Sequence, residues 1–323
     1  MNIKRNIIFI VFIVISLSLG IVIYMVPGIA DILTKTVTVE YGDFQVTDDA
    51  DFYIVRDEMV YLSADEGHIN YYLKQNELVR KGAKVLEIIP SALSDLDEAR
   101  YSELREKLGS RVVIQGNYQG EFSGILSYYV DGLEETLNPG TMETFSYQDA
   151  IKFDIEQINL VRDDAYAQEP IYKICKNDIW YLVTWVNRGV ISKYEPGNDV
   201  TVYLPKGDVK AKVYNILPDG ERWKVILSTN RYYVDFADKR KLGATVLTSD
   251  YKGIIIPNES IASLEEQMGV YVINKKGDKV YTPIKIYATD GENSCIAVEF
   301  YYDNEGKRIN TVDIYDTLVR KPN

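Results

Sequence analysis

Side chains that commonly carry catalysis are scarce in this chain of 323 residues, which has one histidine and two cysteines. Because His68 is the only imidazole, no site can use two histidines, which excludes His-rich zinc centres and multi-histidine iron sites. Cys175 and Cys295 form no CxxC pair and no disulfide framework, so we expect two small buried hydrophobic residues. His68 follows a turn glycine and is expected at an exposed or half-buried strand position.

Longer catalytic signatures are absent as well. The sequence contains no GxSxG elbow, no P-loop and no GxGxxG, so hydrolase and nucleotide-binding functions have no local support. A carboxylate pair for glycoside hydrolysis would depend on distances in the fold, since 48 acidic residues make chance pairs certain. We therefore predict no catalytic, cofactor-binding or metal-ligating residues, and a protein that is not an enzyme.

Two groups of aspartates leave an alternative open. Asp48, Asp49 and Asp51 supply carboxylate oxygens of the kind that hard cations prefer, but consecutive acids in a polar turn also form a solvated loop. The same choice applies to Asp163 and Asp164, and neither place shows a twelve-residue calcium loop. The solvated loop is the simpler expectation for both.

Charge excludes another class of function. The chain carries 36 Lys and Arg against 48 Asp and Glu, a net charge of -12. Nucleic-acid binding requires clustered cations that neutralise phosphates, so this acidic balance argues against it.

The N-terminus contains one long apolar segment. Residues 7–26 are twenty uncharged residues, about 30 Å as a helix, which is enough to cross a bilayer core. Lys4 and Arg5 precede it, so the positive-inside rule predicts a cytoplasmic tail of residues 1–6, a single-pass membrane protein and an extracytoplasmic C-terminal bulk. A cleaved signal peptide is the alternative, because Gly28 and Ala30 resemble a small-x-small cleavage site.

After residue 36 the pattern is mainly β, with short Val-, Ile-, Tyr- and Thr-rich segments between Gly, Asp and Asn turns. Residues 52–64 are expected to form one or two strands with a polar turn near 56–58, and residues 170–186 a hairpin that turns at 176–178. Closely spaced strands after that hairpin predict a small antiparallel barrel. Apolar residues at helical spacing predict a helix over 91–108, and a second helix is expected over 147–157.

The aromatic residues admit two interpretations. The pairs Tyr128–Tyr129, Tyr232–Tyr233 and Tyr301–Tyr302 could form a stacking face for cell-wall sugars. Adjacent strand residues point to opposite faces, however, so each pair places one ring on any given surface, and ordinary packing is expected. The three tryptophans, at positions 180, 185 and 223, lie inside strand signals and are expected in the core.

The order of several motifs resembles the membrane fusion proteins, also called HlyD-like periplasmic adaptor subunits. Residues 39–44 (VEYGDF) after an N-terminal anchor are similar to the family's entry strand. Glu66-Gly67-His68-Ile69, Val79-Arg80-Lys81-Gly82 and Val85-Leu86 resemble its first lipoyl-like half-motif. Residues 195–200 (EPGNDV) fit the turn within its middle barrel, and residues 253–261 followed by 269–272 resemble the entry to its membrane-proximal domain.

The resemblance implies a fold in which two half-motifs, 66–88 and 120–140, pack together as a barrel-sandwich hybrid. The expected domains are a transmembrane helix (7–26), a lipoyl-like barrel-sandwich domain (36–145) with a helical insertion (91–108), a β-barrel domain (158–250) and a membrane-proximal-like β domain (251–323).

This sequence departs from the family in two respects. In pump adaptors of double-membraned bacteria a long helical hairpin separates the two halves, whereas here a single helix of about 27 Å does so, which makes a single-membrane bacterium the more natural host. Lipoyl and biotinyl carriers present a modifiable lysine at a hairpin tip, but Lys84 is expected inside a strand, so no such cofactor is predicted.

The function implied is a non-enzymatic adaptor held at the cell membrane. Its expected partner is an inner-membrane transporter for efflux or export, with assembly in several copies; a role in envelope or division assembly is a second version. The helix over 91–108 could dock a partner helix or cover its own barrel. From a different class, the alternative is a surface-displayed cell-wall-binding module or wall-active enzyme.

Overall fold

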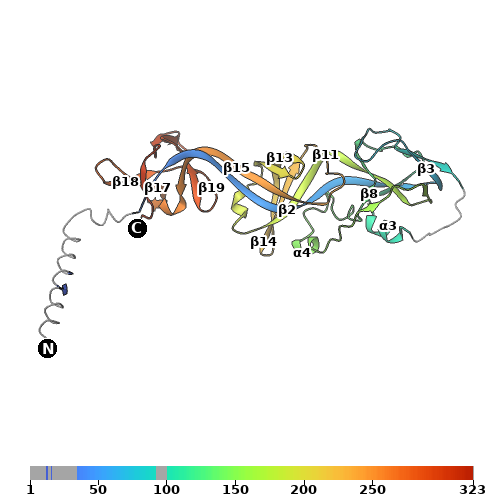
Figure 1. Ribbon diagram of the computed structural model, residues 1–323, viewed down its shortest axis with the longest axis horizontal. Helices are drawn as coiled ribbons and strands as arrows, with labels where there is room; N and C mark the ends of the chain where they lie inside the picture. The colour runs from blue at the N-terminus through green and yellow to red at the C-terminus, as the bar shows by residue number, and fades with distance from the viewer. Residues whose placement is uncertain (1–11, 14–15, 17–34, 92–99, 323) are drawn as a thin grey trace, which may run out of the picture. The chain divides into compact units, whose positions relative to one another are not determined.

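The computed structural model describes residues 12–13, 16, 35–91 and 100–322, and the chain divides into two compact units. Unit 1 comprises Met1–Gln45 and Asp250–Asn323, and unit 2 comprises Val46–Ser249. Strands dominate both units, as Figure 1 shows, which confirms the mainly β fold class. Two long strands, β2 (Glu40–Ser63) and β15 (Lys241–Pro257), contribute residues to both units.

The predicted transmembrane helix, residues 7–26, lies outside the described residues except for positions 12, 13 and 16. Among the residues that are described, no helix has the length and apolar character needed to cross a membrane.

Helices are few and short in the described part of unit 2. The insertion predicted as a helix over 91–108 contains α3 (Ser102–Leu108), and residues 92–99 lie outside the described residues. The second predicted helix is too long: α4 (Tyr147–Ala150) ends after one turn, and Phe153 then packs its ring against Tyr53 at 5.9 Å. Tertiary packing of an aromatic residue therefore overrides the local helical pattern.

The two half-motifs pack against each other, as expected for a barrel-sandwich hybrid. In the first half, β3 (Gly67–Tyr71) pairs with β5 (Leu86–Pro90), and β4 (Leu78–Val79) pairs with β7 (Gly124–Ser127) of the second half. Side chains of both halves share one core, including Val85 and Leu126. Further strands of this module are β6 (Val112–Gln115), β8 (Tyr129–Val130), β9 (Ile158–Asn159) and β10 (Asp164–Ala165).

The glycine at position 67, in the first half-motif, has a clear steric explanation. Gly67 has φ +150°, and a Cβ there would lie 2.1 Å from the carbonyl oxygen of Ile89 in β5. Only glycine allows β3 and β5 to approach so closely.

The second module of unit 2 is a closed antiparallel barrel. Its strands follow the order β15, β12, β13, β14, β11 and β2, and a pairing between β15 and β2 closes the sheet. The new strands are β11 (Pro170–Asn187), β12 (Asp199–Leu204), β13 (Gly207–Asp219) and β14 (Arg222–Thr229), with a 3-10 turn η1 (Ile191–Lys193) before β12.

Strand alternation gives this barrel two apolar faces. The inner face contains Trp180 and Leu182 of β11, and the opposite face contains Val183 and Trp185. The core prediction is confirmed for Trp180 and Trp185, which are buried, while Trp223 is half-buried against the inner face. Because both faces are apolar, something must cover the outer one.

The predicted hairpin over 170–186 is wrong. These residues form the single strand β11, which pairs with β2 on both sides of a register shift between Cys175 and Trp180. The predicted polar turn at 56–58 is wrong for the same reason, since these residues lie within β2. The polar residues at both places form a bulge rather than a chain reversal.

Unit 1 has a separate core formed by residues from both ends of the chain. Val39 packs with Ile254, Val270 and Leu318. Residues 36–45, which the sequence analysis grouped with the barrel-sandwich module, thus pack in unit 1. One sheet has the order β1 (Thr36–Thr38), β23 (Thr317–Val319), β17 (Gln267–Ile273) and β16 (Ala262–Leu264), and β18 (Lys279–Pro283) also pairs with β17.

The remaining elements of unit 1 are short. They are η2 (Asn258–Ser260), β19 (Ile286–Thr289), β20 (Asn293–Ile296), β21 (Phe300–Tyr302) and β22 (Arg308–Asn310).

Candidate functional site

The joint between the two modules of unit 2 is the most unusual place in the described residues. Here β11 changes partner: residues 173–176 pair with β7 of the barrel-sandwich module, and residues 180–187 pair with β14 of the barrel. At the register shift, four residues of β11 (176–179) lie opposite Asp57 of β2. The same two strands therefore cross both modules, and the bulge marks the crossing point.

Six charged side chains are buried at this crossing, each at most 3% exposed. We call them the charged joint: Arg56, Glu58, Asp131, Glu134, Lys173 and Arg240. Three cations face three carboxylates, so the set is neutral when all are ionised. Burying charge is costly unless it is paired, and here every member has an ionic partner.

Glu58 is the centre of the joint. Its carboxylate accepts a hydrogen bond from Arg56 Nε at 2.8 Å, lies 3.0 Å from Lys173 Nζ, and also pairs with Arg240. Lys173 Nζ also donates to Glu134 at 3.1 Å, and Arg240 Nε donates to Asp131 at 2.7 Å. Because these residues come from four segments of the chain, the pairs fix all four segments at once.

The joint shifts the pKa of its acids in opposite directions. Burial alone would raise the pKa of Glu58, but Arg240, Arg56 and Lys173 outweigh it and hold that pKa well below its usual range. The pKa of Asp131, also against burial, is lowered to about 2 by Arg240 and Lys173.

Glu134 behaves differently from its two neighbours. Burial raises its pKa, the charges of Asp131 and Glu58 add to this, and the attraction of Lys173 does not compensate. Its Oε2 atom also has no hydrogen-bond partner among the described residues. The joint thus lowers the pKa of one glutamate and raises that of the other.

A segment that we call the strap, residues 131–157, connects β8 to β9 and covers the outer face of the barrel. Leu137, Met142 and Phe145 of the strap pack against Trp185 and Ile226 of the barrel. The strap begins and ends in the barrel-sandwich module, because β8 and β9 pair with each other. It therefore ties one module to the surface of the other.

A buried lysine anchors the middle of the strap. Lys224 of β14 donates from Nζ to the carbonyl oxygens of Met142 and Glu143, each at 3.1 Å, and to that of Phe145. The Nζ atom also lies 4.6 Å from the centre of the Phe145 ring. Burial lowers the pKa of Lys224.

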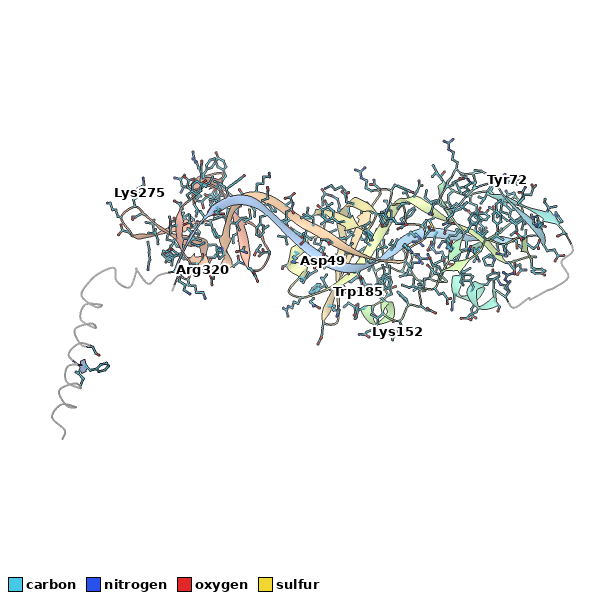
Figure 2. The ribbon with its side chains drawn as sticks, in the orientation of Figure 1. Asp49, Tyr72, Lys152, Trp185, Lys275 and Arg320 are labelled. Atoms are coloured by element: carbon cyan, nitrogen blue, oxygen red, sulfur yellow. The ribbon has the colours of Figure 1, made fainter. Side chains whose placement is uncertain are left out.

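The strap is also held by Asp219 of the barrel. Asp219 Oδ2 accepts hydrogen bonds from the Tyr147 backbone and from Trp185 Nε1, both at 2.6 Å. Figure 2 labels Trp185 on the barrel and Lys152 on the neighbouring strap. The start of α4 is capped by Ser146 and Asp149, which accept each other's backbone N–H.

A third link comes from the loop that precedes β15. Asp238 accepts hydrogen bonds from Asn76 Nδ2 at 2.9 Å and Ser127 Oγ at 3.0 Å, and from Gln75. All three donors belong to the barrel-sandwich module. The charged joint, the strap and this loop therefore link the two modules at three places.

The aspartates considered for cation binding have other partners. Asp48 accepts from Tyr194 OH at 2.7 Å, Asp49 from Thr245, and Asp51 pairs with Lys241 at 3.0 Å. They lie in β2 rather than in the solvated loop that was expected, so that expectation is wrong. No group of metal-binding side chains is assembled within the described residues.

Other expectations for single residues are confirmed. Cys175 and Cys295 are free and buried, and His68 is exposed and lies 3.2 Å from Asp164. The expectation that Lys84 lies inside a strand is wrong, because this residue forms an isolated bridge with Gln119 just before β5. In the tyrosine pairs one ring is always less exposed than the other, as at Tyr232 (63%) and Tyr233 (3%).

Sequence reasoning missed the charged joint, although a signal for it was present. Arg56 and Glu58 alternate with Phe52, Ile54 and Val60 at a period of two, which places all five on buried positions of one strand. Nothing local predicted their partners, because Asp131, Glu134 and Arg240 come from distant segments.

Two family models match the chain in succession and together cover more than half of it. One describes an RND-related barrel-sandwich hybrid domain and matches residues 58–177; the other describes an RND-related β-barrel domain and matches residues 180–250. The chain belongs to the membrane fusion protein family. The boundary between the two membrane fusion protein domains falls at the β11 register shift, where the charged joint lies.

Several solved structures are similar to this chain over much of its length. MacA from Actinobacillus actinomycetemcomitans is 12% identical, with 88% of this chain and 99% of that chain covered and a TM-score of 0.39. ZneB from Cupriavidus metallidurans is 12% identical, with 89% and 92% covered and a TM-score of 0.31. Spr0693 from Streptococcus pneumoniae R6, a membrane fusion protein, is 9% identical, with 62% and 97% covered and a TM-score of 0.26.

These scores are too low for the solved structures to carry an argument about function. No curated protein matches the sequence.

Proposed function

We propose that this protein is a non-enzymatic adaptor, anchored in the cell membrane by residues 7–26, whose extracytoplasmic modules couple a membrane transporter to export. The observation that supports this most is the charged joint with its strap. A joint of this kind serves no chemistry on a substrate, since its charges are buried and paired, but its ion pairs and the strap link two β modules, and we expect these links to hold the modules rigid. Rigidity is the property that an adaptor needs to transmit movement.

The length of the insertion between the two half-motifs supports a single-membrane host. Residues 91–111 separate β5 from β6, and even a fully helical hairpin of that length would extend only about 16 Å. A connection to a channel in a second membrane needs a longer reach. We therefore favour export across one membrane, with membrane-proximal placement of unit 1.

The first test determines on which side of the membrane each end of the protein lies. Both native cysteines are buried, so single engineered cysteines can be labelled without background. In intact cells, a membrane-impermeant maleimide should label Tyr203→Cys, an exposed barrel position. It should label Asn2→Cys only after permeabilisation. The opposite pattern, or loss of the N-terminus from the mature protein, would overturn the anchored topology.

Partner capture is the second test. A photocrosslinking residue at Tyr203, with buried Tyr172 as the matched control position, is introduced into the full chain and activated in native membranes. We expect Tyr203 to capture a transporter subunit and Tyr172 to capture nothing. Capture of septal or wall-synthesis proteins without a transporter would replace export with envelope assembly.

Binding to purified peptidoglycan distinguishes a wall-binding function from both the export and the envelope-assembly roles. If the protein binds purified peptidoglycan in a salt-resistant manner, or releases products from it, the adaptor proposal fails.

A further inference from the structure

Two turns of opposite charge lie at opposite ends of β17 in unit 1. The turn from β16 into β17 contains Glu265 and Glu266, which we call the glutamate turn. The turn from β17 into β18 spans residues 274–278, and with Lys279 at the start of β18 it has the sequence NKKGDK; we call residues 274–279 the lysine turn. Since β17 has seven residues, the two turns are about 20 Å apart.

The lysine turn is held in shape by Asn274. Its Oδ1 accepts from the backbone N–H of Lys276 at 2.8 Å and of Asp278 at 2.9 Å, and its Nδ2 donates to Asp278 Oδ2 at 3.0 Å. With three lysines and one aspartate, residues 274–279 have a formal net charge of +2. Lys275 and Lys276 are exposed and have no carboxylate partner in the described residues, and Figure 2 shows Lys275 at one extremity of unit 1.

The backbone of the glutamate turn is strained at both charged residues. Glu265 and Glu266 have φ values of 51° and 67°, in the left-handed region that favours glycine or asparagine. Both side chains are exposed. The two turns at the ends of β17 thus carry opposite charges, in a chain whose net charge is -12.

The segment between the predicted anchor and β1 is long enough for either the lysine turn or the glutamate turn to reach the membrane. Strand β1 begins at Thr36, opposite Val319, and nine residues separate it from position 26. Nine residues span at most about 32 Å, which exceeds the length of β17. The length of this segment therefore allows either turn to face the bilayer. We expect the charge of the bilayer surface to decide which turn does so.

We propose that the lysine turn is a contact for anionic lipid headgroups and orients unit 1 on the bilayer. This inference rests on the proposed anchor. Lipid phosphates attract lysines near the surface, so two lysines favour this end by more than about tenfold where the leaflet is anionic. The same surface repels the glutamate turn, which makes the orientation one-sided.

The test uses the full chain reconstituted in lipid nanodiscs that contain phosphatidylglycerol or only phosphatidylcholine. A fluorophore is placed at Val280→Cys, beside the lysine turn, or at Leu264→Cys, beside the glutamate turn; both positions are about half exposed, at 47% and 49%. A headgroup spin-labelled lipid serves as quencher. We expect the probe at 280 to be quenched at least about threefold more than the probe at 264 in phosphatidylglycerol discs, and the difference to fall in phosphatidylcholine or high salt.

A double variant, Lys275→Gln with Lys276→Gln, should abolish the difference, while Lys212→Gln in the barrel should leave it unchanged. Equal quenching at both positions, stronger quenching at 264, or no dependence on lipid charge would overturn the proposal; an acidic protein partner would then be the better occupant. Failure of the anchor is distinguishable, because the protein would not remain with the discs at all.

Discussion

The charged joint of unit 2 and the lysine turn of unit 1 both consist of charged side chains, but these side chains lie in opposite environments. In the joint, Glu58 and Arg240 have fully buried side chains and several ionic partners. In the lysine turn, Lys275 and Lys276 are exposed and have no carboxylate partner in the described residues. Burial decides the difference: a buried charge fixes geometry because it is costly to leave unpaired, whereas an exposed one stays available to a partner.

The strongest test of this comparison is Glu58→Gln. It removes the carboxylate that Arg56, Lys173 and Arg240 share, so Arg56 loses its ionic partner, while Lys173 and Arg240 each lose one of theirs. We expect a loss of about 3–5 kcal/mol in the free energy of unfolding of unit 2. Denaturant titration followed by tryptophan fluorescence measures it, because all three tryptophans lie in unit 2.

Glu134→Gln is the matched control in the same joint. Its pKa is raised and one of its oxygens has no partner in the described residues, so a neutral isostere should cost less than about 1 kcal/mol. Equal losses for the two variants would contradict the central place of Glu58 in the joint.

Acid should weaken the same joint. Glu58 and Asp131 have pKa values below those of an unfolded chain, so their contribution is full above pH of about 4 and is lost as pH falls toward the folded values, about 2 for Asp131. The raised pKa of Glu134 has the opposite sign, so its contribution grows as pH falls toward the unfolded value of about 4.3 and is complete before this loss begins. Unfolding free energies measured between neutral and acid pH should fall steeply below pH 4, and the slope should be shallower in Glu58→Gln.

Lys224→Met tests the strap separately from the charged joint. The change leaves three buried carbonyl oxygens without their donor, and we expect unit 2 to lose about 2 kcal/mol. Hydrogen exchange should rise first in residues 141–150. Lys212→Met, at an exposed barrel position, should not change exchange in the strap. Uniform loss of protection across both modules would contradict a local role for the strap.

The smallest effect is expected at an exposed pair. Lys252 and Asp43 of unit 1 lie 3.1 Å apart, with side chains 70% and 65% exposed. Solvent and salt screen such a pair, so Lys252→Met should not measurably change hydrogen exchange in unit 1. A clear loss of protection there would show that burial is not what separates the two kinds of charge.

Much of the fold was predictable from local patterns. The glycine turns at Gly67 and Gly82 and the apolar strands around them predicted the half-motifs, because turn geometry and strand alternation depend on neighbouring residues. The burial of both cysteines followed from the absence of any pairing motif. The continuity of β11 was not predictable, since Lys176-Asn177-Asp178 suits a hairpin turn and a bulge equally well.

The sequence alone therefore determined the order of β-rich modules, the scarcity of catalytic side chains and the presence of a long apolar N-terminal segment. Tertiary structure decided which charges are buried and paired. Arg56 and Glu58 join a buried network only because folding brings Asp131, Lys173 and Arg240 from other parts of the chain into it. It also decided that residues 131–157 cover the barrel. The physical reason is that periodicity reports which face a residue is on, whereas electrostatic partnership depends on segments brought together only by folding.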